Sequence, residues 1–316
     1  MRRQYEKPIV YAVKHNDQER MKSQSGAAFA YLSDLILEQG GVIYGCIFNE
    51  DYKAVHSRAE SKEERDGMRY SKYVQSDMLD SMKAVLADLR SGRTVLFSGT
   101  SCQVAGLQSF VELSDPESSE RLFCVDILCK GVPSPLVWKD YLDWERGKVN
   151  SPIKRVLCRN KRQFGWKSHV VTIDYENGET CASRVFPRIF KGNNVLRPSC
   201  YECPYKSILH PGDVTIADYW GIDEAAPGFK DDKGVSLVLV NSSVGEALFE
   251  SGKDRLVCLR TRIEDSMQKP LREPCERPKT RERFWRDYAS RDFSYIAYWY
   301  GVNGFWARVY RKLKIE

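Results

Sequence analysis

Thr94-Val95-Leu96-Phe97-Ser98-Gly99-Thr100-Ser101-Cys102-Gln103 joins a short apolar run to a polar loop and the beginning of a helix. The apolar run from Thr94 to Phe97 predicts a short buried strand. The residues that follow lie between the end of this strand and a helix start. Strand, loop and helix in this order form the repeating unit of α/β proteins.

The same alternation extends in both directions from this stretch. Before it we expect strands at residues 8–13 and 42–49, a helix that ends at Gln39, and a helix at 78–90. After it we expect a strand at 122–128 and a helix at 135–144. Short apolar runs that alternate with amphipathic helices predict an α/β (α+β) fold with a largely parallel or mixed sheet and flanking helices.

The pattern changes near residue 150. Apolar runs at 156–159 and 170–175, followed by the turn Asn177-Gly178, predict an antiparallel insert. Further runs at 213–220 and 235–240 precede a helix that begins near Ser243, and Pro270, Pro274 and Pro278 mark a connector. We therefore expect an α/β lobe at 1–150, a second lobe at 151–269 that carries Cys200 and Cys203, and a basic, aromatic, helical tail at 270–316.

Composition excludes several classes of protein. The 316 residues include 42% hydrophobic and 29% charged residues, which excludes a disordered chain. No run of 18 apolar residues predicts a membrane span, and no apolar segment follows the basic N-terminal residues as it would in a secretory signal. The sequence therefore indicates a cytoplasmic protein.

The positive charge lies near the C-terminus, where residues 253–316 carry 16 Lys and Arg against 9 Asp and Glu. Together with aromatic residues such as Trp285 and Trp299, this pattern favours an amphipathic closing helix. The alternatives are contact with an anionic membrane surface, a nucleic acid or an acidic partner protein. We expect no nucleic acid, and peripheral association with the inner membrane stays open.

Common catalytic motifs are missing from the sequence, including G-x-G-x-x-G, G-x-x-x-x-G-K-[ST], H-E-x-x-H and G-x-S-x-G. The chain has four histidines but ten cysteines, many for a cytosolic protein in which disulfides stay reduced. Cys46 and Cys124 lie in apolar strands and are expected to pack as small hydrophobic side chains. The remaining cysteines are the best source of chemistry.

Four cysteines form a candidate metal site. Cys200-Tyr201-Glu202-Cys203-Pro204 has a spacing that suits half of a zinc site, a redox dithiol or two cluster ligands. Cys102 lies at a helix start, where backbone amides stabilise a thiolate, and Cys129 closes the next strand. The set Cys102, Cys129, Cys200 and Cys203 suits an iron–sulfur cluster and zinc about equally well.

A series of motifs then carries a resemblance to a known family. In chain order the motifs are Ser23 to Phe29, Ser71 to Ser76, Gly99 to Leu107, Cys129 to Ser134, Arg159-Asn160-Lys161 with Gly165-Trp166, Leu196 to Lys206, and Asp213 to Gly221. Over nearly its whole length the chain resembles the coenzyme F-420 hydrogenase/dehydrogenase beta subunit family.

The resemblance implies an iron–sulfur flavoprotein oxidoreductase. One 4Fe-4S cluster would lie on the four cysteines beside FAD, and electrons would pass between the two cofactors and a small-molecule hydride acceptor. The resemblance makes 1–150 the flavin-binding lobe, gives the lobe at 151–269 the C-x-x-C cluster ligands, and places Ser25, Gly26, Lys72, Gln75, Thr100 and Gln103 around the flavin. From the residues alone, Ser25 and Gly26 could equally be capping residues, and Lys72 a solvated lysine.

The chain also departs from the family pattern. The ferredoxin-like segment that precedes this region in many relatives is missing, which implies a separate ferredoxin-type electron carrier or a lost start. Lys130 replaces a common His, so use of a deazaflavin substrate is in doubt. Relatives occur in polysaccharide biosynthesis gene sets, and we expect this setting. The alternative from another class is a zinc-stabilised scaffold or binding module without redox activity.

Overall fold

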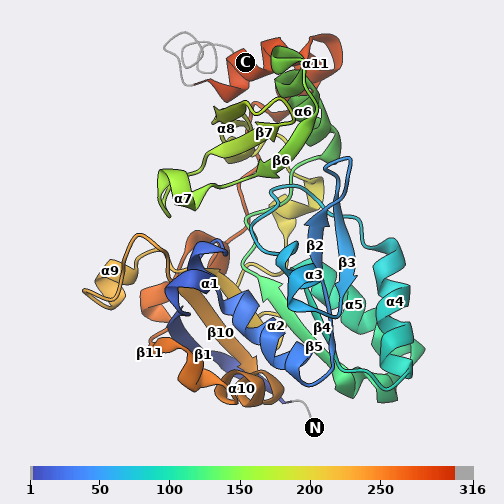
Figure 1. Ribbon diagram of the computed structural model, residues 1–316, viewed down its shortest axis with the longest axis vertical. Coiled ribbons are helices and arrows are strands. Elements are labelled where there is room, and N and C mark those ends of the chain that lie inside the picture. The colour runs from blue at the N-terminus through green and yellow to red at the C-terminus, as the bar shows by residue number, and fades with distance from the viewer. Residues whose placement is uncertain (1–2, 303–316) are drawn as a thin grey trace.

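The computed structural model describes residues 3–302 (Figure 1). Its main feature is an eight-stranded sheet with the strand order β11-β1-β10-β9-β5-β4-β2-β3. The bounds are β1 Gln4–Lys14, β2 Val42–Phe48, β3 Ala54–Ala59, β4 Val95–Thr100, β5 Leu122–Ile127, β9 Val214–Asp218, β10 Ser236–Ser242 and β11 Val257–Thr261. The pairs β2–β4, β4–β5 and β5–β9 are parallel and the others are antiparallel, so the expected mixed α/β sheet is confirmed.

Helices cover both faces of this sheet. The helices that accompany the large sheet are α1 Asp17–Met21, α2 Ala28–Glu38, α3 Lys62–Asp66, α4 Leu79–Arg90, α5 Ser101–Ser114, α9 Ile222–Ala225 and α10 Ser243–Glu250. On one face, Leu32 of α2, Phe249 of α10 and Leu96 of β4 belong to one hydrophobic cluster. On the other face, helices α4 and α5 pack against Val95 and Phe97. Neighbouring strand residues point to opposite faces, so each apolar residue of β4 has a helix to cover it.

A smaller lobe holds the antiparallel sheet β6-β7-β8, drawn above the large sheet in Figure 1. Its strands are β6 Ile153–Leu157, β7 Val171–Tyr175 and β8 Thr180–Ser183, and its helices are α6 Pro135–Val149, α7 Lys161–Phe164 and α8 Val185–Lys191. Residues Asn177 and Gly178 form the turn between β7 and β8, where Gly178 has a φ of 88°. The predicted antiparallel insert is therefore confirmed.

The described part of the C-terminal tail packs on this smaller lobe. Helices α11 Arg281–Ser290 and α12 Phe293–Ile296 lead into a single π-helical turn at Ala297–Gly301. Phe284, Ile296 and Tyr300 are buried against α6 and α8. Aromatic side chains of residues 281–301 thus form part of the hydrophobic core of the smaller lobe. The rest of the predicted tail, residues 303–316, lies outside the described residues.

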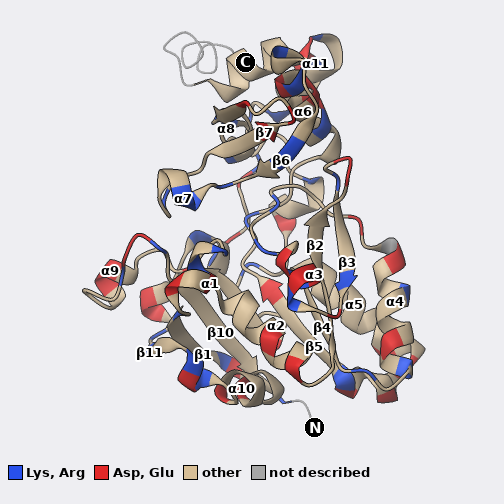
Figure 2. Cartoon of the chain, viewed as in Figure 1, with Lys and Arg blue, Asp and Glu red and all other residues tan. Residues whose placement is uncertain are grey.

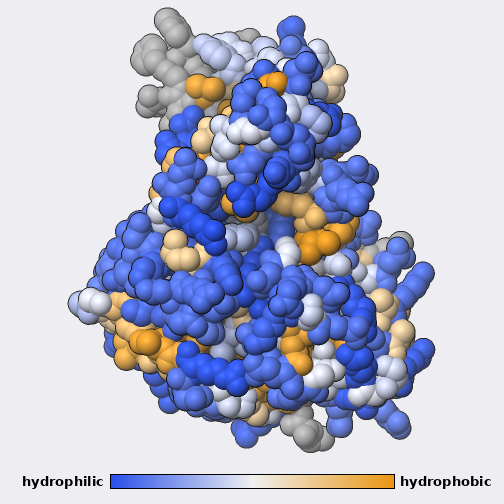
Figure 3. Space-filling model, in the orientation of Figure 1, coloured by the Kyte–Doolittle hydropathy of each residue, from blue (hydrophilic) through white to orange (hydrophobic). Residues whose placement is uncertain are grey.

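Strands from both sides of residue 150 share the large sheet, because β9, β10 and β11 lie beside β5 and β1. The partition into 1–150, 151–269 and 270–316 stays a prediction. Within residues 3–302, no helix combines the length and the apolar character needed to cross a bilayer. The surface in Figure 3 is mostly hydrophilic and is hollowed between the two lobes.

Candidate functional site

Two of the candidate cysteines lie at one edge of the large sheet. Strands β4 and β5 are parallel neighbours, with Thr100 opposite Ile127 at their carboxyl ends. Cys102 is the second residue of α5, which begins directly after β4, and Cys129 follows β5 by two residues. The carboxyl ends of parallel strands meet at the same edge, so Cys102 and Cys129 lie at one edge of the sheet.

The segment that carries Cys200 lies alongside the segment that carries Cys129. The N–H of Arg197 donates to the carbonyl of Val132 at 2.9 Å, and the N–H of Ser134 donates to that of Val195 at 2.9 Å. Gly131, with a φ of 149°, faces Cys200, and a Cβ added at Gly131 would lie 3.3 Å from the Cys200 Cβ. Glycine at this position lets the two segments approach closely.

Burial and neighbouring charges affect the pKa values of two of the candidate thiols. Burial raises the pKa of the Cys129 thiol to about 12; the Lys206 ammonium and the N–H of Gly131 oppose this rise, whereas the thiols of Cys200 and Cys102 add to it. Burial also raises the pKa of Cys200, with the N–H of Val132 opposing and Cys102 and Cys203 adding. Cys102 and Cys200 thus influence Cys129, and Cys102 and Cys203 influence Cys200.

Lys206 is a residue of the site that sequence reasoning did not single out. Its ammonium donates a hydrogen bond to the carbonyl of Cys129, and its side chain is buried. The Thr100 hydroxyl lies 3.2 Å from the sulfur of Cys102. A buried cation and backbone N–H groups favour the thiolate form of nearby cysteines. Among residues 3–302, no group of three or more His, Cys, Asp or Glu side chains is arranged to hold a single metal ion.

Three of the residues predicted for the flavin lie close to Cys102. The Gln103 Oε1 atom accepts hydrogen bonds from the N–H and the hydroxyl of Thr100, each at 3.0 Å. The Gln103 Nε2 atom donates to the Ser76 hydroxyl at 2.8 Å. Gln75 precedes Ser76, and its N–H donates to the carbonyl of Pro133 at 3.2 Å. These contacts connect the segment 71–76 to both cysteine-bearing strand ends.

Lys72 has its own polar surroundings. Its ammonium donates to the carbonyls of Gly67 and Arg69 at 2.9 and 2.7 Å. Burial lowers the pKa of Lys72 to about 8, while the thiols of Cys46 and Cys158 raise it. Lys72 is therefore held in place by the chain, unlike a solvated lysine.

Ser25 and Gly26 lie on the loop that precedes α2. The Ser25 hydroxyl donates to the carbonyl of Val235 at 2.7 Å. A Cβ added at Gly26 would lie 2.0 Å from the carbonyl oxygen of Val13 and 2.5 Å from the nitrogen of Ser236. The loop is thus fixed against β1 and β10, which gives Gly26 a steric role in addition to any role at a cofactor.

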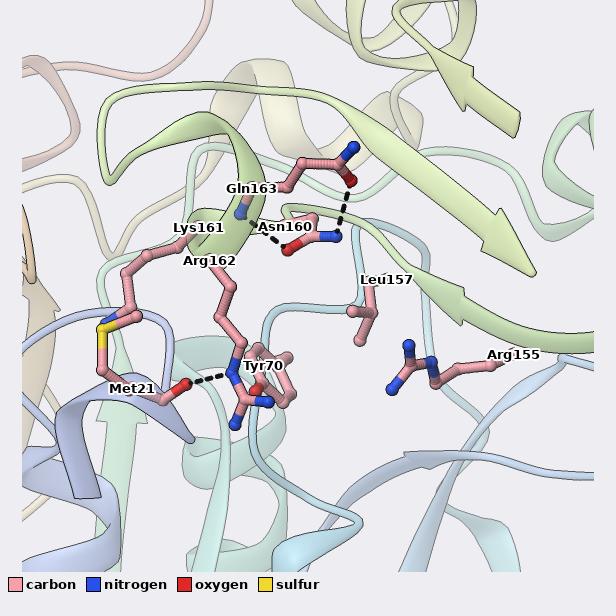
Figure 4. A pocket seen from close by; sticks show the side chains of 8 residues that line it. All are labelled: Met21, Tyr70, Arg155, Leu157, Asn160, Lys161, Arg162 and Gln163. Carbon is pink, nitrogen blue, oxygen red and sulfur yellow. Dashed lines mark hydrogen bonds between the residues drawn. The ribbon is translucent and has the colours of Figure 1, made fainter. Parts of the chain in front are cut away.

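A cavity of about 430 Å³ adjoins this loop, and Figure 4 shows its lining. Lys161 donates to the carbonyl of Ser25 at 3.2 Å, and burial lowers the pKa of its ammonium to about 7. The guanidinium of Arg162 lies beside Tyr70 and donates to the carbonyl of Met21 at 2.9 Å. The cavity is lined by Met21, Tyr70, Arg155, Leu157, Asn160, Lys161, Arg162 and Gln163. Its basic residues belong to β6 and α7 (Figure 2), so the cavity favours an anionic group.

A buried ion pair joins the two lobes above the large sheet. Arg159 follows β6 and is 1% exposed, and its guanidinium lies 2.5 Å from the carboxylate of Asp218 at the end of β9. The indole Nε1 of Trp166 donates to the same carboxylate at 2.7 Å. Asp218 therefore fixes the orientation of the small lobe beside the sheet edge.

These features define an α/β protein with Cys102 and Cys129 at the carboxyl ends of two parallel strands and the Cys200 segment alongside Cys129. The family described as the C terminus of the coenzyme F420 hydrogenase/dehydrogenase beta subunit matches residues 92–265, and the chain belongs to this family. The matched range includes all four candidate cysteines, as well as Thr100 and Gln103.

The fold is similar to that of a chain in the F420-reducing [NiFe] hydrogenase complex from Methanosarcina barkeri. The two share 16% sequence identity and a TM-score of 0.55, and the similarity covers 80% of this chain and 82% of that chain. A search of curated proteins finds no match.

Proposed function

We propose that this chain is an iron–sulfur flavoprotein oxidoreductase that uses a 4Fe-4S cluster, FAD and a small-molecule hydride acceptor. The observation that carries the proposal is the position of Cys102 and Cys129 at one edge of the sheet, with the segment of Cys200 held alongside Cys129. Membership of the F420 hydrogenase/dehydrogenase beta subunit family supports an oxidoreductase.

The residues at the sheet edge fit an iron–sulfur cluster. Thiolates are the cluster ligands, and N–H groups that point to the sulfur atoms tune the cluster's reduction potential. Gly131 and Val132 supply such N–H groups to Cys129 and Cys200, and Lys206 supplies a positive charge. A cubane holds its four thiolates apart through the iron and sulfide between them, so the cysteines need to share one pocket and need not touch.

The fit to FAD rests on position. Thr100 and Gln103 lie beside Cys102, and Gln103 bonds to Ser76, the neighbour of Gln75, so a flavin held by these residues would lie beside the cluster. Gln103 and Lys72 already donate hydrogen bonds within the chain, so a bound flavin would share these donors. A cluster moves single electrons and a flavin can collect two of them for hydride transfer.

The hydride acceptor is proposed to carry an anionic group. The cavity beside the Ser25 loop offers Arg162 and Arg155, although Arg155 also pairs with Asp174 at 2.7 Å. Electrons would arrive from a separate ferredoxin-type carrier at the exposed side of Cys102. The setting in polysaccharide biosynthesis, the cytoplasmic location and the attachment of the tail to the inner membrane remain proposals from the sequence.

Cofactor analysis of the protein after purification without oxygen tests this function. We expect roughly four iron and four sulfide per chain, as a cubane held by cysteines requires, together with flavin absorbance. Cys124→Ala serves as the control, because Cys124 is fully buried in β5. A colourless protein that holds zinc and neither iron nor sulfide would contradict the proposal and would favour a zinc-stabilised scaffold.

A further inference from the structure

A single buried carboxylate connects three segments that carry the candidate cluster ligands. Asp126 lies on β5, three residues before Cys129, and is 0% exposed. Its Oδ2 atom accepts a hydrogen bond from the hydroxyl of Ser101 at 2.6 Å, and Ser101 precedes Cys102. The same oxygen lies 2.7 Å from Nδ1 of His210, which belongs to the loop that follows Cys203.

Further contacts hold this group of side chains together. Nδ1 of His210 also lies 3.2 Å from the Ser101 hydroxyl, and the other carboxylate oxygen accepts from the hydroxyl of Thr215 at 2.6 Å. Gln108 of α5 donates to the carbonyl of Pro211 at 2.9 Å. The loop after Cys203 is therefore fixed to α5 and β5, and Asp126 also connects β5 to β9.

Stability alone does not explain this arrangement. A buried carboxylate loses its hydration, and well-packed apolar side chains often stabilise a core at least as well. Asp213 offers a comparison, since it is also 0% exposed. Its carboxylate accepts from the N–H of Cys124 at 2.9 Å and from the hydroxyl of Ser242 at 2.7 Å, so these contacts hold strands of the sheet. The contacts of Asp126 instead join the segments around Cys102, Cys129 and Cys203.

We propose that Asp126, with Ser101 and His210, positions the cysteines of the iron–sulfur site. This inference rests on the proposed function and adds a supporting group that sets where the ligand-bearing segments lie relative to one another. Partners outside the ligand set orient metal ligands and tune the bound metal. Ser101, Asp126 and His210 are positioning residues, because they act through the segments that bear the cysteines.

The test compares three variants, each purified without oxygen as the full chain. Asp126→Asn removes the charge, and Ser101→Ala removes the hydroxyl that contacts Asp126 and His210, with little change in volume. Asp213→Asn is the matched control, because it alters an equally buried carboxylate of the same sheet. Two measurements do not depend on activity: the rate of iron release to a chelator, and the electron paramagnetic resonance spectrum of the reduced protein.

We expect Asp126→Asn to release iron about tenfold faster than the wild type, the size of effect known for groups that support metal ligands, and Ser101→Ala to show a smaller increase. The resonance spectrum should shift in both. Asp213→Asn should lose stability and keep the wild-type release rate and spectrum. Hydrogen exchange should be faster in residues 101–103 and 208–212 of Asp126→Asn than in the control.

Equal iron release or equal exchange in Asp126→Asn and Asp213→Asn would overturn the positioning role. If Asp126→Asn does not fold, Ser101→Ala becomes the deciding variant. A wild-type rate of iron release and an unchanged resonance spectrum in Ser101→Ala would also overturn the positioning role. A wild-type chain that binds neither iron nor sulfide would overturn the proposed function itself, and this result is seen before any variant is made.

Discussion

Individual cysteines of this chain differ in what surrounds them. Cys158 is buried and Cys129 is partly buried, and burial raises the pKa of the Cys129 thiol to about 12 and that of the Cys158 thiol to about 11. Around Cys129 lie two further candidate ligands, Cys102 and Cys200. Cys158 has Lys72 and the single thiol of Cys46 nearby. Neighbouring thiols, more than burial, therefore distinguish a candidate ligand from a cysteine of the core.

Alanine variants of the cysteines test this distinction. Cys102→Ala, Cys129→Ala, Cys200→Ala and Cys203→Ala should each abolish the cluster, because each removes one of the four thiolates that a cubane requires. Cys46→Ala and Cys124→Ala should keep it and cost on the order of 1 kcal/mol of stability. Iron content and chemical unfolding measure the two effects. Equal iron content in all six variants would defeat the assignment.

The ammonium of Lys161 should make the free energy of unfolding depend on pH. Burial lowers its pKa from 10.5 to about 7, so between these values the unfolded chain binds more protons than the folded chain. Stability should therefore rise from about pH 7 towards pH 10. Lys161→Met should flatten this rise, whereas Lys154→Met, which alters an exposed lysine, should not. Parallel stability curves for wild type and Lys161→Met, from urea unfolding at several pH values, would contradict the assignment.

At the scale of single elements, we predict opposite effects on stability for alanine substitutions at two glycines. Gly26→Ala should destabilise the protein by about 3 kcal/mol or more, since its Cβ would overlap the backbone of β1 and β10. Gly106 lies within α5, and a Cβ added there meets nothing within 4 Å. Gly106→Ala should therefore stabilise the protein by about 0.5–1 kcal/mol. Thermal and chemical unfolding measure the stability of both variants. An unchanged stability in Gly26→Ala would show that the loop is not held against β1 and β10.

The sequence predicted the central strands of the large sheet better than its edges. The strands β4 and β5 are buried on both faces and therefore read as continuous apolar runs. The edge strands β3 and β11 went unpredicted, because each alternates or mixes polar and apolar residues in a short segment. In β11, Val257 is 60% exposed and Leu259 is 41% exposed, and Figure 3 shows hydrophobic atoms in that region. An edge strand pairs on one side only, so sequence pattern constrains it weakly.

The candidate site was predictable to the extent that its chemistry is local. The C-x-x-C pair and the cysteine at a helix start can be found from spacing and from the strand–loop–helix pattern. Lys206, Asp126 and His210 could not be found in this way, because their roles depend on burial and on contacts between distant segments. The Asp126 and His210 side chains, for example, are 84 residues apart in the sequence.

At the scale of the whole molecule, the first and the last strands of the large sheet lie side by side. Strand β1 lies between β10 and β11, and the residues of the small lobe lie between these strands in the sequence. Apolar patterning predicts strands but does not predict which distant strands will pair. The two lobes are then joined by the ion pair of Arg159 and Asp218 above the sheet.

Breaking this ion pair should loosen the two lobes. Asp218→Asn leaves the guanidinium of Arg159 buried and uncompensated, which should cost about 3 kcal/mol of stability. The matched control is Asp174→Asn, which removes an exposed pair with Arg155 within the small sheet and should cost about 0–1 kcal/mol. Chemical unfolding and limited proteolysis between the lobes measure the difference. Equal losses in the two variants would show that Asp218 does not join the lobes.

Anomalous X-ray scattering at the iron edge, from crystals of the protein prepared without oxygen, tests the iron–sulfur assignment at its source. We predict an iron signal enclosed by the sulfur atoms of Cys102, Cys129, Cys200 and Cys203. A zinc signal at that place, or four sulfur atoms with no metal among them, would contradict it.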